Sequence, residues 1–207
     1  MSNGVKLYTL FCAIFCTIII TSNLIFQKFI SFELFNQKFD ITVGVLFYPI
    51  TFLISDLVTE FFGKKNATFM VKVSVVCSII ILILIKIADA CHSNSWSKVD
   101  DFTFHVVFGS YSFAVIISIF ANYVGQVTDI YIFSYLKQLT DGKYLWLRNI
   151  ISTLAGLTVD AVSITSLLSI FGLIEFEHFK AIMFGGIIFK LFATIISVPI
   201  YYLFYHR

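Results

Sequence analysis

Charged residues are scarce in this 207-residue sequence. Asp, Glu, Lys and Arg make up only 13% of it, whereas 59% of the residues are hydrophobic and the mean hydropathy is +0.94. A soluble domain of this size would have too little polar surface with such a composition. The composition therefore indicates a protein whose natural solvent is the bilayer. At roughly 20 apolar residues per span, the length accommodates six helices and little else.

Sequence motifs for several kinds of chemistry are also missing. Cys12, Cys16 and Cys77 lie inside apolar stretches and Cys91 stands alone beside a polar loop, so we expect neither a disulfide framework nor a metal site. No histidine lies within an expected span, and there is no H-E-x-x-H or paired-Asp protease motif. No ATP-binding motif occurs either. We therefore expect no enzyme activity and no cofactor.

Long apolar stretches alternate with short polar connections. We predict an all-α integral membrane protein with a single transmembrane domain over residues 1–207, built as a bundle of six transmembrane helices. The longest connection, 89–105, is expected to be a loop. The six spans lie near residues 7–26, 41–62, 69–88, 108–133, 147–171 and 181–204.

Lysine and arginine are unevenly distributed over the connections. The N-terminal segment, the second and fourth connections and the C-terminal segment carry eight of them, and the other connections carry five. Because cytoplasmic loops retain positive charge during insertion, the bias predicts that both termini lie in the cytoplasm. The first group is Lys6, Lys64, Lys65, Lys72, Lys137, Lys143, Arg148 and Arg207, and the second is Lys28, Lys38, Lys86, Lys98 and Lys180.

Once the lysines and arginines near the span ends are counted with the connections, five ionisable residues remain within the expected spans: Asp56, Glu60, Asp129, Asp160 and Lys190. An Asp or Lys at the centre of a membrane helix raises the free energy of insertion by roughly 2.5 to 3.5 kcal/mol. Such residues persist when they face a bundle interior, pair with one another or have a function. They therefore predict a polar cavity inside the bundle.

Polar residues recur at helical spacing around these charges. Steps of three and four residues place them on one face of each helix, so four spans are expected to carry a polar stripe. The stripes are Thr51, Ser55, Asp56, Thr59 and Glu60 in the second span; Asn122, Gln126 and Asp129, followed by Phe133, in the fourth; Asn149, Thr153, Gly156, Asp160 and Ser163 in the fifth; and Lys190, Thr194 and Ser197 in the sixth.

A short internal repeat links the fourth and fifth spans. The segment 125–129, GQVTD, recurs 31 residues later at 156–160 as GLTVD, so each copy has Gly four residues before Asp. Adjacent spans run in opposite directions, and the two copies would approach an enclosed site from opposite sides, as transporter repeats do. A chance match is the alternative interpretation.

Structural interpretations compete with functional ones for some of the charges. Glu60, near the cytoplasmic end of its span, could snorkel or pair with Lys64. Asp160 and Lys190 could form a purely structural ion pair.

Asp129 is harder to explain as a packing device. Together with Gln126 and Asn122 it puts three strongly hydrogen-bonding side chains on one buried face, more than helix association usually uses. We therefore expect a binding site there.

Several segments, in order along most of the chain, resemble the signature of the VUT (YhhQ-like) family of queuosine precursor transporters. The clearest is 47–65, with the sequence FYPITFLISDLVTEFFGKK. The others are an N-to-K element from Asn23 to Lys28, a Q-x-x-D element from Gln126 to Asp129 followed by Ile132 and Phe133, the loop TDGKYLWLRN at 140–149, and Ser152 with Thr153.

The resemblance implies uptake of a queuosine precursor for tRNA modification across the inner (plasma) membrane. The substrate would be 7-cyano-7-deazaguanine, its aminomethyl relative or queuine, so the expected partners are a small molecule and membrane lipid, with no nucleic acid; the oligomeric state is left open. The implied fold is a six-helix bundle similar to the substrate-binding subunits of vitamin uptake systems. The alternative is a substrate-binding membrane subunit for another small polar nucleobase or vitamin that needs an energising partner.

The resemblance also implies roles for the polar residues. Asp129 or Asp160 would accept hydrogen bonds from the ring N–H and exocyclic amine of the base. Gln126 or Asn122 would donate to its carbonyl oxygen, and an aromatic ring beside the stripes would cover its flat face. The candidate substrate-binding residues are Asp129, Gln126, Asp160, Asn122, Asp56 and Phe133, with Tyr123 and Phe47 as further stacking candidates, and those for ion coupling or a structural charge are Glu60, Lys190 and Asn23.

One position departs from the family pattern. The family usually repeats Q-x-x-D in the fifth helix, but Leu157 precedes Asp160 in this sequence. The missing amide would change the ligand edge that this helix contacts, which suggests a different 7-deazaguanine.

Overall fold

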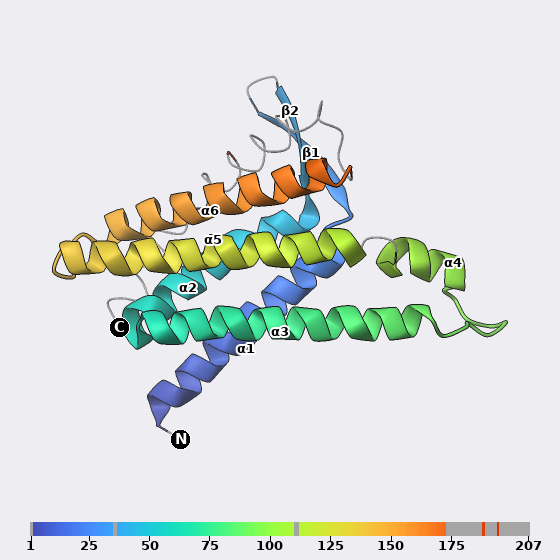
Figure 1. Cartoon of the computed structure of the whole chain (residues 1–207), viewed down its shortest axis with the longest axis horizontal. Helices are drawn as coiled ribbons and strands as arrows, with labels where there is room; N and C mark the ends of the chain where they lie inside the picture. The colour runs from blue at the N-terminus through green and yellow to red at the C-terminus, as the bar shows by residue number, and fades with distance from the viewer. Residues whose placement is uncertain (1, 35–36, 110–111, 173–187, 189–193, 195–207) are drawn as a thin grey trace.

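The computed structural model describes residues 2–34, 37–109, 112–172, 188 and 194. Helices dominate this part of the chain, and a two-stranded antiparallel sheet follows the first long helix in the sequence (Figure 1). In order, the elements are α1 (Asn3–Ile25), β1 (Phe29–Leu34), β2 (Gln37–Thr42), the 3-10 helix η1 (Val43–Phe47), α2 (Tyr48–Phe62), α3 (Lys64–Asp89), α4 (Asp101–Phe104), the π-helix η2 (His105–Gly109), α5 (Ser112–Leu139) and α6 (Leu145–Ile170).

Five helical segments in the described ranges are long and apolar enough to cross a membrane. They correspond to the first five expected spans, although α5 runs to Leu139, beyond the expected end at residue 133. The expected sixth span, 181–204, lies outside the described residues except for positions 188 and 194, and Lys190 lies outside them too.

The expectation of an all-α fold needs one correction, at residues 29–42. There β1 and β2 form a hairpin whose register runs from Phe29 opposite Thr42 to Leu34 opposite Gln37. A bond from the Val43 N–H to the Lys28 carbonyl oxygen, 2.7 Å, closes its base. The second span therefore begins as a helix at Val43, not at residue 41 as expected, because residues 41 and 42 still pair with β1.

Local signals fix where the helices begin and end. Pro49 lies in the first turn of α2, where its missing N–H leaves no hydrogen bond unmade. Gly63 separates α2 from α3 and has a φ of +84°, a left-handed conformation that glycine adopts without steric penalty. The turn between α5 and α6 uses Asp141, Gly142 and Tyr144 at positive φ.

The connections gather at two opposite ends of the bundle (Figure 1). The α2–α3 link and the α5–α6 turn lie at one end, which we call the Lys137 end. The hairpin and α4 lie at the other, the hairpin end. Successive helices therefore run in opposite directions, and α6 lies alongside α5 over most of its length.

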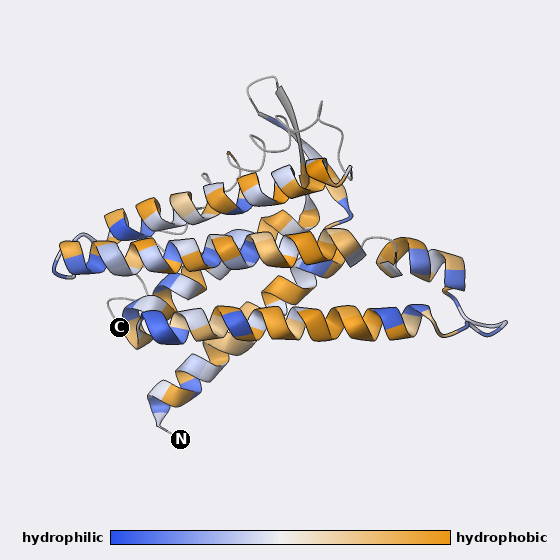
Figure 2. Cartoon of the chain, in the orientation of Figure 1, coloured by the Kyte–Doolittle hydropathy of each residue, from blue (hydrophilic) through white to orange (hydrophobic). Residues whose placement is uncertain are grey.

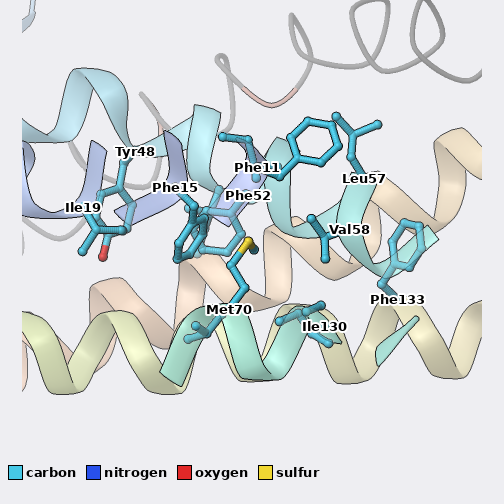
Figure 3. Packing of buried hydrophobic residues seen from close by; sticks show 14 of the residues in the cluster. Phe11, Phe15, Ile19, Tyr48, Phe52, Leu57, Val58, Met70, Ile130 and Phe133 are labelled. Carbon is cyan, nitrogen blue, oxygen red and sulfur yellow. The ribbon is translucent and has the colours of Figure 1, made fainter. Parts of the chain in front are cut away.

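The apolar core lies where α1, α2, α3 and α5 meet (Figure 3). Its side chains interdigitate at almost zero exposure, so this packing fixes the position of α2 within the bundle. The largest fully buried members are Phe15, Phe52, Leu57, Val58, Met70, Val71, Ile130 and Phe133.

The outer surfaces of the helices are also hydrophobic. Figure 2 shows hydrophobic residues over most of α3, and many of its large apolar side chains are exposed. A continuous apolar surface of this kind suits contact with lipid rather than water. The exposed apolar residues of α3 include Val76, Ile79, Ile80, Ile83, Leu84 and Ile87.

Candidate substrate site

A row of polar side chains runs along α2, on the face that contacts α5 and α6. We call it the polar seam. The predicted helical spacing brings its members onto facing surfaces, and all but Glu60 are buried. The seam consists of Tyr48, Thr51, Ser55, Asp56 and Glu60 of α2, Asn122, Gln126 and Asp129 of α5, and Asn149, Thr153 and Asp160 of α6.

Two carboxyl groups meet at the centre of the seam. Asp129 Oδ2 accepts a hydrogen bond from Ser55 Oγ at 3.1 Å. Asp56 Oδ2 accepts from Asn149 Nδ2 and, at 3.4 Å, from Thr153 Oγ1. The Asp56 and Asp129 carboxyl groups are also within hydrogen-bonding range of each other, and both residues are 0% exposed. The predicted stripes of three helices therefore converge.

Toward the hairpin end, the Tyr48 hydroxyl forms hydrogen bonds with two further residues of the predicted stripes. Its hydroxyl donates to Asp160 Oδ1 at 3.2 Å and accepts from Asn122 Nδ2 at 2.5 Å. Asn122 and Asp160 are thus linked through a side chain that the sequence reasoning overlooked. The signal was present, because Tyr48 precedes Asp56 by eight residues and so lies on the same face of α2.

Gln126 lies between these two groups along α5. Its Nε2 donates to Thr51 Oγ1 at 2.9 Å, and the Thr51 hydroxyl donates to the Tyr48 carbonyl oxygen at 2.7 Å. Gln126 is fully buried, as is Thr51. Polar contacts between α2 and α5 therefore occur at Asn122, Gln126 and Asp129.

The internal repeat lies at the close approach of α5 and α6. A Cβ on Gly125 would be 2.7 Å from Asp160 Cβ and 2.9 Å from the Gly156 carbonyl oxygen. A Cβ on Gly156 would be 2.8 Å from both Asp129 Cβ and the Gly125 carbonyl oxygen. Each glycine thus makes room for the aspartate of the other copy, which gives the repeat a packing role.

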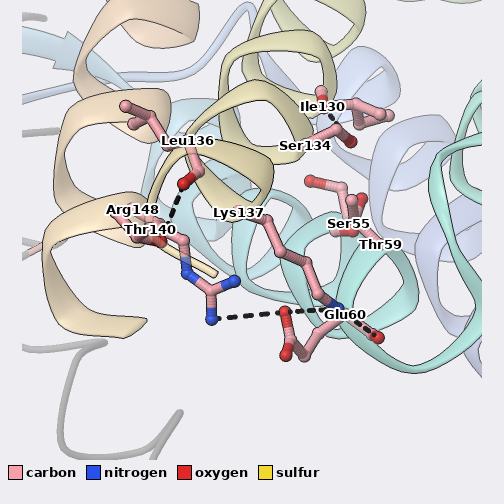
Figure 4. A network of polar contacts seen from close by, with 9 residues as sticks. All are labelled: Ser55, Thr59, Glu60, Ile130, Ser134, Leu136, Lys137, Thr140 and Arg148. Atoms are coloured by element: carbon pink, nitrogen blue, oxygen red, sulfur yellow. Dashed lines mark hydrogen bonds and ion pairs between the residues drawn. The ribbon is translucent and has the colours of Figure 1, made fainter. Parts of the chain in front are cut away.

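A three-residue ion cluster closes the seam at the Lys137 end (Figure 4). Glu60 Oε2 lies 3.1 Å from Lys137 Nζ and 3.5 Å from Arg148 Nη2. Lys137 also donates to the Glu60 carbonyl oxygen at 3.0 Å. The cluster joins α2, α5 and α6, since each helix contributes one residue.

Two sequence-based interpretations at this end were wrong. The proposed partner of Glu60, Lys64, instead has its Nζ 3.6 Å from the centre of the Tyr131 ring. Arg148, which was counted as a loop charge, is 0% exposed. The first error arises because partners on other helices compete with the neighbour four residues away.

The stacking candidates have different surroundings. Phe133 is fully buried in the core, and the guanidinium carbon of Arg148 lies 5.1 Å from its ring centre. Phe47 is 42% exposed and Tyr123 is partly buried against the core. Stacking of a ligand on Phe133 stays a prediction.

Asn23 lies away from the seam. Its Oδ1 accepts from Ser118 Oγ at 3.1 Å, and its side chain lines a pocket between α1, α3 and η2, together with Gln27 and Ser78. This pocket contains none of the aspartates of the seam. The structure therefore does not bring Asn23 to the other candidate residues.

The comparisons with known proteins agree with this architecture. Residues 42–204 match the family model described as "Putative vitamin uptake transporter". The chain belongs to this family. A "Probable queuosine precursor transporter" of Haemophilus influenzae is 31% identical over 168 residues, which cover 79% of this chain and 68% of that protein. No solved structure matches the chain at a significant level.

The seam of this transporter has no metal-binding arrangement. Among the described residues, no group of three or more His, Cys, Asp or Glu side chains could hold a metal ion. What the seam offers is hydrogen bonding in a buried setting. Such a site can distinguish ligands by their donors and acceptors, because a mismatched ligand leaves buried polar atoms unsatisfied.

Proposed function

We propose that this transporter is a carrier that takes up a queuosine precursor, a 7-deazaguanine base, across the inner membrane for tRNA modification. The observation that carries the proposal is the contact of Asp56 with Asp129 at the centre of a buried polar seam. Membership of an uptake transporter family and the name of the Haemophilus relative support it. Both termini would lie in the cytoplasm.

The chemistry of such a base suits the seam. Its ring N–H and exocyclic amine are donors, which carboxylate oxygens accept side by side, so we assign the donor edge to Asp129 with Asp56. The carbonyl oxygen needs a donor. Asn122 and Gln126 each use an amide N–H within the seam, and each amide nitrogen carries a second hydrogen that is available for the base.

We assign Glu60 a structural role rather than a role in ion coupling. Its carboxylate contacts two cations, one of them fully buried, and loss of its charge would leave that cation without an acid partner. The carrier would alternate access around the two aspartates while the cluster of Glu60, Lys137 and Arg148 holds one end closed.

Uptake of labelled 7-deazaguanines tests the proposal in cells that lack their own synthesis and express the transporter. We expect uptake that is lost in Asp129→Asn, which keeps the shape and removes the charge. The control is Asp141→Asn, the same change at an exposed turn residue. Absence of uptake by the native chain would reject the function, and normal uptake by Asp129→Asn would reject the site.

Reconstitution of the purified chain in liposomes separates a carrier from a binding subunit. A carrier moves substrate into the liposomes by itself. Binding without transport would mean that an energising partner is required.

A further inference from the structure

Three buried oxygen atoms at the centre of the seam have no hydrogen-bond donor among the described residues. They are Gln126 Oε1, Asp129 Oδ1 and Asn149 Oδ1. Their residues are 0%, 0% and 2% exposed, so bulk water does not reach them. A buried acceptor without a donor is destabilising, which makes these atoms candidates for contact with a ligand.

The neighbouring amide groups each direct one N–H to another acceptor, and their second N–H does not reach the three oxygens. Asn149 Nδ2 donates to Asp56, and Gln126 Nε2 donates to Thr51. Ser55 lies within reach of Asp129 Oδ2 and of the Phe52 carbonyl oxygen, and its hydroxyl has one hydrogen to give.

The other two hydroxyl groups beside Asp129 are also engaged, and one of them, Thr153 Oγ1, donates to Asp56 Oδ2 at 3.4 Å. Ser152 faces the Asp129 carboxyl group and donates to the Asn149 carbonyl oxygen at 3.3 Å. The seam thus leaves a surplus of acceptors that its own donors do not reach.

Negative charge adds to this surplus. No Lys or Arg of the described ranges forms an ion pair with Asp129, and the two basic residues nearest in the seam, Lys137 and Arg148, contact Glu60 instead. A buried carboxylate without a cation is destabilising, and a positively charged ligand would compensate it.

A guanine-like edge does not use all of these acceptors. Its ring N–H and amine occupy one carboxylate side by side, so the amide oxygens of Gln126 and Asn149 remain for a further substituent. That substituent must donate hydrogen bonds. A protonated amine has three N–H donors and a positive charge, whereas a nitrile has only an acceptor.

We propose that the site selects a positively charged, amine-bearing base, and therefore prefers 7-aminomethyl-7-deazaguanine to the neutral 7-cyano compound. This inference rests on the proposed function and specifies its substrate. The amine lies against Gln126 Oε1 and Asn149 Oδ1, near the negative charge of the Asp129 carboxylate that accepts from the guanine-like edge, and its charge-assisted bonds satisfy both amide oxygens.

Competition experiments test the preference directly. The native transporter takes up a labelled 7-deazaguanine at pH 7 while unlabelled aminomethyl or cyano compound is titrated in. We expect the aminomethyl compound to compete at a concentration at least about tenfold lower. Equal or better competition by the cyano compound would overturn this inference and leave the proposed function standing. If the transporter takes up neither compound and neither one competes, the proposed function itself is rejected.

Two variants locate the preference. Asp129→Asn replaces an acceptor by a donor and removes the charge, so the aminomethyl compound should lose its advantage in binding to purified protein. Gln126→Glu adds a negative charge beside the same acceptors and should widen the advantage. Asp141→Asn, at the exposed turn, should keep the native ratio. An unchanged ratio in both seam variants, at native levels of folded protein in the membrane, would overturn the inference.

Discussion

Gly156 lies so close to Asp129 that no side chain fits between them: a Cβ on Gly156 would come within 2.8 Å of Asp129 Cβ. This contact couples the packing of α5 and α6 to the position of a carboxyl group. The same relationship holds between Gly125 and Asp160 at 2.7 Å, so both aspartates of the repeat depend on a glycine of the neighbouring helix.

Gly156→Ala should therefore push α6 away from α5. Overpacking of this kind typically destabilises a protein by about 1 to 3 kcal/mol, and here it also displaces Asp129, so we expect a lower thermal stability in detergent and reduced uptake. Gly4→Ala is the matched control, since a Cβ there meets only Phe62 Cε1 at 4.0 Å. Equal stability of the two variants would contradict the packing role.

Glu60→Gln should destabilise the transporter strongly. It leaves the guanidinium of Arg148, which is 0% exposed, without an acid partner, and breaking a buried ion pair from one side typically costs about 3 to 5 kcal/mol. Thermal unfolding of the purified variants measures the effect. Lys64→Gln serves as the control, because Lys64 contacts Tyr131 and not Glu60. A comparable loss in Lys64→Gln would favour the pairing first expected from the sequence.

Tyr48→Phe should weaken the hairpin end of the seam. The change removes the hydroxyl that accepts from Asn122 and donates to Asp160, and loss of a partner for a buried donor costs about 1 to 3 kcal/mol. We expect lower stability and a reduced rate of uptake. Tyr135→Phe removes a hydroxyl from a residue that is 56% exposed and should behave as the native chain. Native uptake in Tyr48→Phe would show that this link has no part in transport.

The loop before α4 should respond to acid through Asp100. Hydrogen bonds from Thr103, including the backbone N–H at 2.8 Å, lower the pKa of Asp100 below its ordinary value of 3.8. Because the folded-state pKa is lowered, the stabilisation is complete above pH 3.8 and disappears as the pH falls through the lowered value. At neutral pH, amide exchange at Thr103 should therefore be slow in the native chain and fast in Asp100→Ala. The same exchange rate in both proteins at neutral pH would contradict this role.

Much of the fold can be predicted from the sequence, because each membrane helix must itself be long and apolar enough to cross the bilayer. Five expected spans correspond to helices, and the α5 stripe of Asn122, Gln126 and Asp129 is buried as its spacing predicted. The hairpin at 29–42 was missed, since its pairing depends on contacts between two strands and not on the hydropathy of either one.

The sequence by itself determined which residues share a helix face, because a period of 3.6 residues is a property of one helix. Only the tertiary structure decided which faces meet. In the folded chain Asp56 contacts Asp129, and Glu60 pairs with Lys137 and Arg148 instead of Lys64. Tyr48 forms hydrogen bonds with both Asn122 and Asp160. These contacts depend on how closely and in what register the helices pack, and the small volume of Gly125 and Gly156 helps to set both for α5 and α6.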